Sequence, residues 1–207
     1  MDQTAPQSIP QPSAIFNRDE AYKILTKYLK NPNLIKHCLA AEAVMRALYR
    51  HFYLNTPEYS SAGEEKWGIT GLLHDADYDL CKGQPEIHGV LLIDKEGDKI
   101  PEDIAYAIKA HNYERTLILP KSLLDWSIAC CDQLTGLIVA ATLVSPEKKI
   151  NKVTVDFIMN RYKERSFAKG ADRKSIEKCE EKLNIPLTEF VAIALEAMQS
   201  ISSELGL

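Results

Sequence analysis

The sequence predicts an all-α protein. Apolar residues recur every three or four positions along most of its 207 residues, which is the spacing of one face of an α-helix. Proline, glycine and asparagine fall mainly between these periodic segments, where they are typical of helix ends and loops. The β-branched stretch LIVAATLV (137–144) continues a helical pattern and has no turn residues at its ends. We therefore expect a bundle of helices.

The predicted helices follow one another along the chain. The first begins at Asn17, and Glu20 three residues later completes a capping-box pattern. Pro32 lies near the start of the second, and a loop rich in Pro, Gly, Ser and Asn follows it at 53–65. The predicted helical segments are 17–30, 31–52, 64–73, 86–96, 101–115, 122–145, 154–167, 172–183 and 186–205. We expect residues 17–150 to form one helical domain, with 151–207 as further helices packed on it.

Composition and charge limit the class of protein. Apolar residues make up 45% of the chain and charged residues 26%, as in soluble globular proteins. A net charge of −4 offers no basic surface for a nucleic-acid polymer. Five cysteines without CxxC spacing do not predict a disulfide framework, and a reduced cytosolic setting fits better.

The N-terminal stretch MDQTAPQSIPQPSAIF is polar and rich in proline. It lacks the basic and apolar regions of a signal peptide, and we expect residues 1–16 to form a flexible tail. No apolar run reaches the roughly 18 residues that a membrane-spanning helix needs. These features predict a cytoplasmic protein without a membrane partner.

Histidines and aspartates stand on helix faces that are otherwise apolar. They are His37, His74, Asp75, His88, His111 and Asp132. His37 lies on the apolar stripe of segment 31–52, and His88 shares a predicted helix face with Leu91 and Leu92. Burying an unpaired carboxylate costs several kcal/mol, so such a group is normally hydrogen-bonded, ion-paired or bound to a metal.

Each of these residues also has an ordinary structural interpretation. A single histidine on an apolar face is more often a hydrogen-bonded core residue than a ligand, and Asp132 could form a buried ion pair. Convergence from four helices favours a metal site in the bundle core. Imidazole with carboxylate suits a divalent transition metal such as Mn, Fe, Zn, Ni or Co.

A calcium loop is a competing interpretation of the same stretch. Asp75, Asp77, Asp79 and Glu86 have the spacing of an EF-hand. Leu80 stands where the loop needs glycine for its sharp turn, which argues against this motif.

The order His37, His74-Asp75, His88, His111 and Asp132 resembles the HD-domain superfamily of metal-dependent phosphohydrolases over about residues 20–145. The resemblance implies an HD-domain-like helical bundle over 17–150 with extra C-terminal helices. It also implies that His37, His74, Asp75 and Asp132 hold one ion, while His88 and His111 hold a second with Asp75 as the bridge. The stretch HDADY differs from the HDIGK signature of the cyclic-dinucleotide branch at Asp77 and Tyr78.

The resemblance implies hydrolysis of a small phosphate ester (a phosphomonoester, nucleotide or phosphodiester) at two metal ions, with His74 and Asp75 as catalytic residues. Arg115, four residues after His111, and Lys82, in the turn after the His-Asp pair, are candidate phosphate contacts. A basic stretch at 161–174 is more typical of a solvated helix face. Two alternatives remain open, a di-iron oxygenase with the same ligand set and a regulatory module that binds metal without turnover. The sequence leaves the oligomeric state open.

Overall fold

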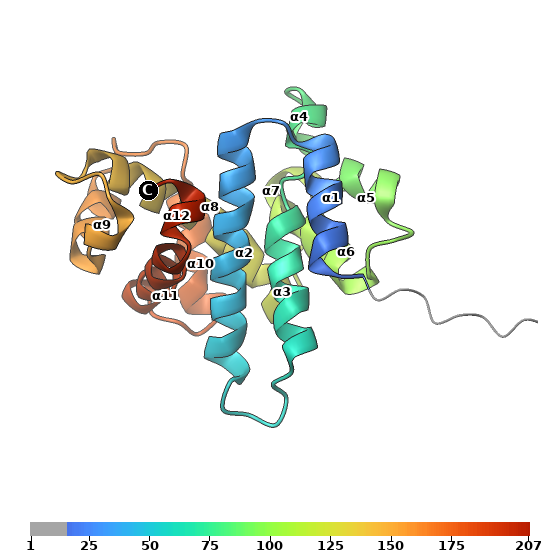
Figure 1. Ribbon diagram of the computed structural model, residues 1–207, viewed down its shortest axis with the longest axis horizontal. Helices are drawn as coiled ribbons and strands as arrows, with labels where there is room; N and C mark the ends of the chain where they lie inside the picture. Colours follow the sequence, from blue (N-terminus) through green and yellow to red (C-terminus); the bar gives the residue numbers. More distant parts are fainter. Residues whose placement is uncertain (1–15) are drawn as a thin grey trace, which may run out of the picture.

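The computed structural model describes residues 16–207 and confirms the all-α prediction, with no strand among these residues (Figure 1). The α-helices are α1 (Arg18–Tyr28), α2 (Pro32–Tyr53), α3 (Ser61–Leu73), α4 (Tyr78–Cys81), α5 (Val90–Glu96), α6 (Glu102–His111), α7 (Tyr113–Thr116), α8 (Leu123–Val144), α9 (Val155–Lys163), α10 (Arg173–Lys182), α11 (Leu187–Ser200) and α12 (Ser202–Leu205). Short 3₁₀ helices η1 (Pro85–Ile87) and η2 (Ile150–Lys152) join them. The predicted N-terminal tail lies outside the described residues except for Phe16.

Several segments differ from the predicted helices. The helix in 154–167 ends at Lys163, and the segment 186–205 breaks at Ile201, between α11 and α12. The segment 86–96 is not one helix. The 3₁₀ helix η1 ends at Ile87, and α5 begins after Gly89, which has a φ of 85°. His88 therefore has extended backbone, and the prediction that it shares a helix face with Leu91 and Leu92 is wrong. The segment 101–115 breaks at Asn112, between α6 and α7.

The long helices α2 and α8 lie at the centre of the molecule. In Figure 1, α9 to α12 pack on one side of α2, while α1, α5 and α6 lie on the other side beyond α3. The larger apolar core joins α2 and α8 to the C-terminal helices, through side chains such as Leu48, Leu134 and Phe190. A smaller core joins α1, α3, α5 and α6 to α2, through side chains such as Leu25 and Leu72. The helices α2 and α8 are thus fixed in place by packing along much of their length.

The helix α8 passes a length and composition test for a membrane span, which corrects the prediction that no segment does. Its most apolar 18 residues have a mean hydropathy of 1.6. Within the protein, 61% of that window is buried, as expected for the core helix of a soluble protein.

The helices α2 and α3 approach each other closely at Gly71. A Cβ atom on Gly71 would lie 2.5 Å from the carbonyl oxygen of Ala41, closer than real Cβ contacts. Figure 1 shows α2 and α3 side by side. The close approach brings His74, which directly follows α3, within 3.1 Å of His37 on α2 (Nε2 to Nε2). A glycine is required here because any larger residue would force the two helices apart.

Gly71→Ala should therefore destabilise the protein by about 1–3 kcal/mol, the usual cost of overpacking a core. Differential scanning fluorimetry should show the melting temperature several degrees lower. Gly136→Ala on α8 is the control, because its Cβ would meet nothing within 4 Å and alanine favours a helix. Equal melting temperatures for the two variants would contradict the steric account.

Glu96 ties α5 to α1. Its buried carboxylate accepts hydrogen bonds from Lys27 Nζ at 2.5 Å, Tyr28 OH at 2.6 Å and Lys99 Nζ at 2.5 Å. The hydrogen bond from Lys27, with those from Lys99 and Tyr28, lowers the pKa of Glu96 from 4.5 to about 2. The carboxylate therefore stabilises the fold above pH 4.5, and this contribution is lost as the pH falls towards 2.

Glu96→Gln should lower the urea midpoint at pH 6, and its difference from the wild type should shrink as the pH falls from 4.5 towards 2. Asp98→Asn changes an exposed carboxylate nearby and should have little effect at either pH. A Glu96→Gln deficit that stays constant down to pH 2.5 would contradict the ion-pair account.

Candidate metal centre

Residues from α2, α3 and α8 form a first group of candidate ligands. His37 lies on α2, His74 and Asp75 directly follow α3, and Asp132 lies on α8. Their ligand atoms all lie within 4.8 Å of one another. His37 Nε2 lies 3.1 Å from His74 Nε2 and 3.0 Å from Asp132 Oδ1. It also lies 3.4 Å from Asp75 Oδ2.

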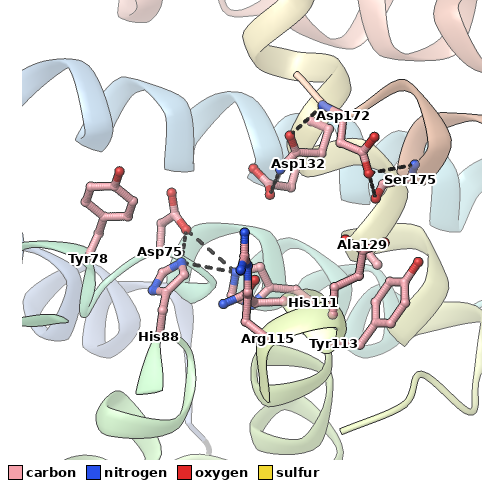
Figure 2. Close-up of a pocket in the computed structure, with 13 residues that line it drawn as sticks. Asp75, Tyr78, His88, His111, Tyr113, Arg115, Ala129, Asp132, Asp172 and Ser175 are labelled. Carbon is pink, nitrogen blue, oxygen red and sulfur yellow. Dashed lines mark hydrogen bonds and ion pairs between the residues drawn. The ribbon is translucent and has the colours of Figure 1, made fainter. Parts of the chain in front are cut away.

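Asp75, His88 and His111 form a second group (Figure 2). His88 Nε2 lies 2.8 Å from Asp75 Oδ1 and 3.3 Å from His111 Nε2. Because Oδ2 of Asp75 faces His37 while Oδ1 faces His88, the same carboxylate belongs to both groups. All six residues singled out in the sequence as metal ligands therefore lie in one place.

A close backbone approach carries His88 to this place. A Cβ atom on Gly89 would lie 2.6 Å from the carbonyl oxygen of Ile108 and 3.1 Å from His111 Cε1. The positive φ of Gly89 and its missing side chain let the turn pack on α6. His88 and His111 meet for this reason, although His88 is not helical.

Hydrogen bonds fix the orientation of three imidazoles. His74 Nδ1 donates to Gly71 O at 2.8 Å, and His111 Nδ1 donates to Ile108 O at 2.5 Å. His88 Nδ1 donates to the carboxylate of Asp77 at 2.7 Å. Carbonyl and carboxylate oxygens only accept, so the proton sits on Nδ1 and the lone pair of the neutral ring is on Nε2.

His37 reaches the same state through Thr135. The Thr135 hydroxyl donates to Asp132 O at 2.8 Å, so its oxygen accepts from His37 Nδ1 at 3.0 Å. All four Nε2 lone pairs therefore point into the centre. Such outer hydrogen bonds commonly set the tautomer of metal-binding histidines.

This arrangement fits a divalent cation. Two Nε2 lone pairs cannot hydrogen-bond to each other, so the 3.1 Å and 3.3 Å contacts need positive charge between the atoms, from a proton or a metal ion. Nitrogen and oxygen ligands at about 2.0–2.2 Å from one ion lie about 3–3.5 Å apart, as most of these atoms do. The described residues can thus hold a metal ion in either group.

Without a bound cation, the carboxylates favour protonated imidazoles at His74 and His88, so a metal ion would compete with protons for Nε2 of these rings. Burial lowers the pKa of His88, but hydrogen bonds to Asp75 and Asp77 outweigh this effect and raise that pKa to about 10. Burial lowers the pKa of His111 to about 4, helped by His88 and His74. Burial also lowers the pKa of His74, but Asp75 and Asp132 outweigh it and raise that pKa to about 9. Despite burial, the histidines hold the pKa of Asp75 and of Asp132 well below the usual range. The carboxylates of Asp75 and Asp132 are therefore negatively charged, and they attract cations.

In the sequence, Asp77 stood out as a position of the calcium-loop spacing and as a departure from the HDIGK signature, and it was not among the predicted metal ligands. Its carboxylate is fully buried and accepts from Gly89 N at 2.9 Å and Leu92 N at 2.9 Å, as well as from His88. Asp77, Cys81 and His88 are also close enough to hold a metal ion. Because the Asp77 oxygens already accept three hydrogen bonds, we assign them to orienting His88.

A cavity of about 310 Å³ opens beside the second group. Figure 2 shows Asp75, His88, His111 and Arg115 on one side and Asp132, Asp172 and Ser175 on the other. Arg115 is exposed, and it has no ion-pair partner among residues 16–207. Lys82, the other predicted phosphate contact, is exposed at the end of α4 and is not among the residues lining this cavity.

Thr135 and Gln133 were not recognised from the sequence. Gln133 Nε2 donates to Asp132 Oδ2 at 2.7 Å. They could have been found only by their positions in the sequence, because both residues lie within one helical turn of Asp132.

No family model matches this chain, and neither curated proteins nor solved structures match it. The resemblance to the HD-domain superfamily stays a prediction from the order of the ligands.

The two groups predict two bound ions. Protein loaded with Mn²⁺ and passed through a desalting column should contain two ions per chain by elemental analysis. His88→Ala with His111→Ala removes two of the three ligands of the second group and should leave one ion. His51→Ala is the control, because His51 lies outside both groups. A double variant that keeps two ions would show that the second group is not a metal site.

Proposed function

We propose that this protein is a metal-dependent hydrolase of a small phosphate ester. The observation that carries the proposal is the position of Asp75, whose carboxylate lies within reach of both ligand groups beside an open cavity. Its Oδ2 lies 3.4 Å from His37 Nε2, and its Oδ1 lies 2.8 Å from His88 Nε2 and 3.5 Å from His74 Nε2. The order of the candidate ligands along the chain, and the family that this order resembles, support the same reaction class.

Each residue has a part that follows from its place. His37, His74 and Asp132 would hold one divalent ion, His88 and His111 would hold a second, and Asp75 would contact both. Such ions supply a Lewis-acid contact to phosphoryl oxygen and lower the pKa of bound water. Asp77 and the carbonyls of Gly71 and Ile108 keep the imidazoles in the required tautomer. His74 and Asp75 thus act by binding and orientation at the reacting end of the cavity.

Arg115 supplies the cationic contact for the substrate. A guanidinium can donate two parallel hydrogen bonds to phosphoryl oxygens. Arg115 and His111 line the same cavity (Figure 2). Arg115 forms no ion pair within residues 16–207, so its guanidinium is available to a substrate. Lys82 does not line this cavity, so we assign it no contact with the substrate.

The cavity favours a small hydrophilic ester with one phosphoryl group. Its volume is about 310 Å³. Arg115 is the one arginine or lysine among its lining residues, and the carboxylates of Glu114 and Asp172 also line it. A second phosphoryl group would meet these like charges. The remaining lining is largely polar, with side chains such as Asn112 and Ser175.

A cytoplasmic location belongs to the same proposal. The five cysteines are free and buried, which suits a reducing compartment.

Metal-loaded protein should release phosphate from a generic aryl phosphate, and the chelated protein should not. Asp75→Ala should lower the rate by at least about a hundredfold, because both ligand groups lose a member. His51→Ala, outside both groups, should retain the wild-type rate.

Arg115→Met should lower kcat/KM by about tenfold or more, since a hydrogen bond to a charged group contributes about 1.5–3 kcal/mol. Lys82→Met is the matched control and should change kcat/KM little. Metal-loaded wild-type protein that releases no phosphate from any ester of a broad panel would reject the hydrolase. Oxygen consumption by the iron-loaded protein would then favour the oxygenase, and its absence the binding module.

A further inference from the structure

Gln133 connects the first ligand group to the C-terminal part of the chain. Its Nε2 donates to Asp132 Oδ2 at 2.7 Å, and its Oε1 accepts from Asp172 N at 3.0 Å. A backbone N–H can only donate, so the amide oxygen must face Asp172. The amide nitrogen is then left for the Asp132 carboxylate, and the orientation of the side chain is determined.

The hydrogen bond from Gln133 to Asp132 fixes which oxygen of the Asp132 carboxylate faces the histidines. With Oδ2 held by Gln133, Asp132 Oδ1 lies 3.0 Å from His37 Nε2 and 3.5 Å from His74 Nε2. Rotation of the carboxylate would break the bond to Gln133. Partners of this kind commonly change metal affinity 10–100-fold when they are removed.

The second contact reaches the start of α10. Asp172 is the N-cap of α10, and its carboxylate accepts from Ser175 N at 3.3 Å and Ser175 Oγ at 2.7 Å. The residues before it, 164–171, form turns that Arg173 organises by donating to the carbonyls of Ala168 at 2.8 Å and Ala171 at 2.9 Å. We call residues 164–172 the covering segment.

The covering segment lies over the His37 side of the centre. Ala168, Gly170 and Ala171 line a second cavity, of about 310 Å³, together with His37 and Asp132. Gln133 lines this cavity and also the one beside His88 and His111. The bridge from Asp132 through Gln133 to Asp172 thus stands between the two cavities.

We propose that Gln133 is a positioning residue that couples metal occupancy of the first group to docking of the covering segment. An ion bound to Asp132 Oδ1 fixes the carboxylate, the fixed carboxylate holds the Gln133 amide, and the amide holds the N–H of Asp172. The coupling requires no substrate and does not depend on the proposed hydrolysis.

Limited trypsin digestion tests the coupling, because Arg165 and Lys169 in the covering segment are exposed. Cleavage at these two residues is followed by mass spectrometry, in Mn²⁺ and after chelation. In the wild type, Mn²⁺ should slow this cleavage by at least about fivefold, the lower end of usual coupling between sites. The double variant His88→Ala with His111→Ala keeps the first group and should show the same protection.

Gln133→Met removes both hydrogen bonds at similar side-chain volume. Its cleavage rate should be the same with and without Mn²⁺ at concentrations that load the first group, and its Mn²⁺ affinity there should fall about 10–100-fold. Gln199→Met is the matched control, because Gln199 also makes two hydrogen bonds, to Ile150 O at 2.9 Å and Val153 O at 3.2 Å. It should retain the metal protection.

Three results would overturn the proposal. The first is a wild type that Mn²⁺ does not protect at Arg165 and Lys169. The second is a Gln133→Met variant that Mn²⁺ protects as well as it protects the wild type. The third is loss of protection in the double variant, which would assign the effect to the second group.

Discussion

The convergence of six acceptor side chains in the protein interior is the constraint on which the rest of the structure depends. Four Nε2 atoms and two carboxylates form two groups that share Asp75, and the ligand atoms of each group lie within 4.8 Å of one another. Such acceptor groups are stable in the interior only with positive charge between them. Each Nδ1 donates a hydrogen bond to an oxygen atom, which removes the alternative tautomer. The six side chains can therefore hold a cation through Nε2 and carboxylate oxygens.

The fold meets this constraint by combining rigid and irregular backbone. His37 and Asp132 stand on α2 and α8, which are packed into the larger core, so their positions are set by helix packing. His74 is placed by the close approach of α3 to α2 at Gly71, and His88 by the turn at Gly89. Two glycines therefore decide whether His74 reaches His37 and whether His88 reaches His111.

The fold class and the grouping of six candidate ligand residues could be predicted from the sequence, because both depend on periodicity and on polar residues in apolar surroundings. The backbone at His88 could not, since Gly89 fits a helical pattern in the sequence but adopts a left-handed conformation. The placement of Lys82 and Arg115 depends on where short helices end, and no spacing rule gives this. The acceptors for His74 and His111 are main-chain carbonyls, which leave no mark in the sequence. Gln133 and Thr135 are recognisable only from their contacts with Asp132 and His37, which the sequence does not give.

The central claim is that Asp75 is shared by two metal ions held through Nε2 of the four histidines. A crystal structure of the Mn²⁺-loaded protein, with anomalous diffraction data, tests it most directly. The account predicts two anomalous peaks, one among His37, His74 and Asp132 and one between His88 and His111, with Asp75 contacting both. A single peak, no peak, or ligation through any Nδ1 atom would contradict it.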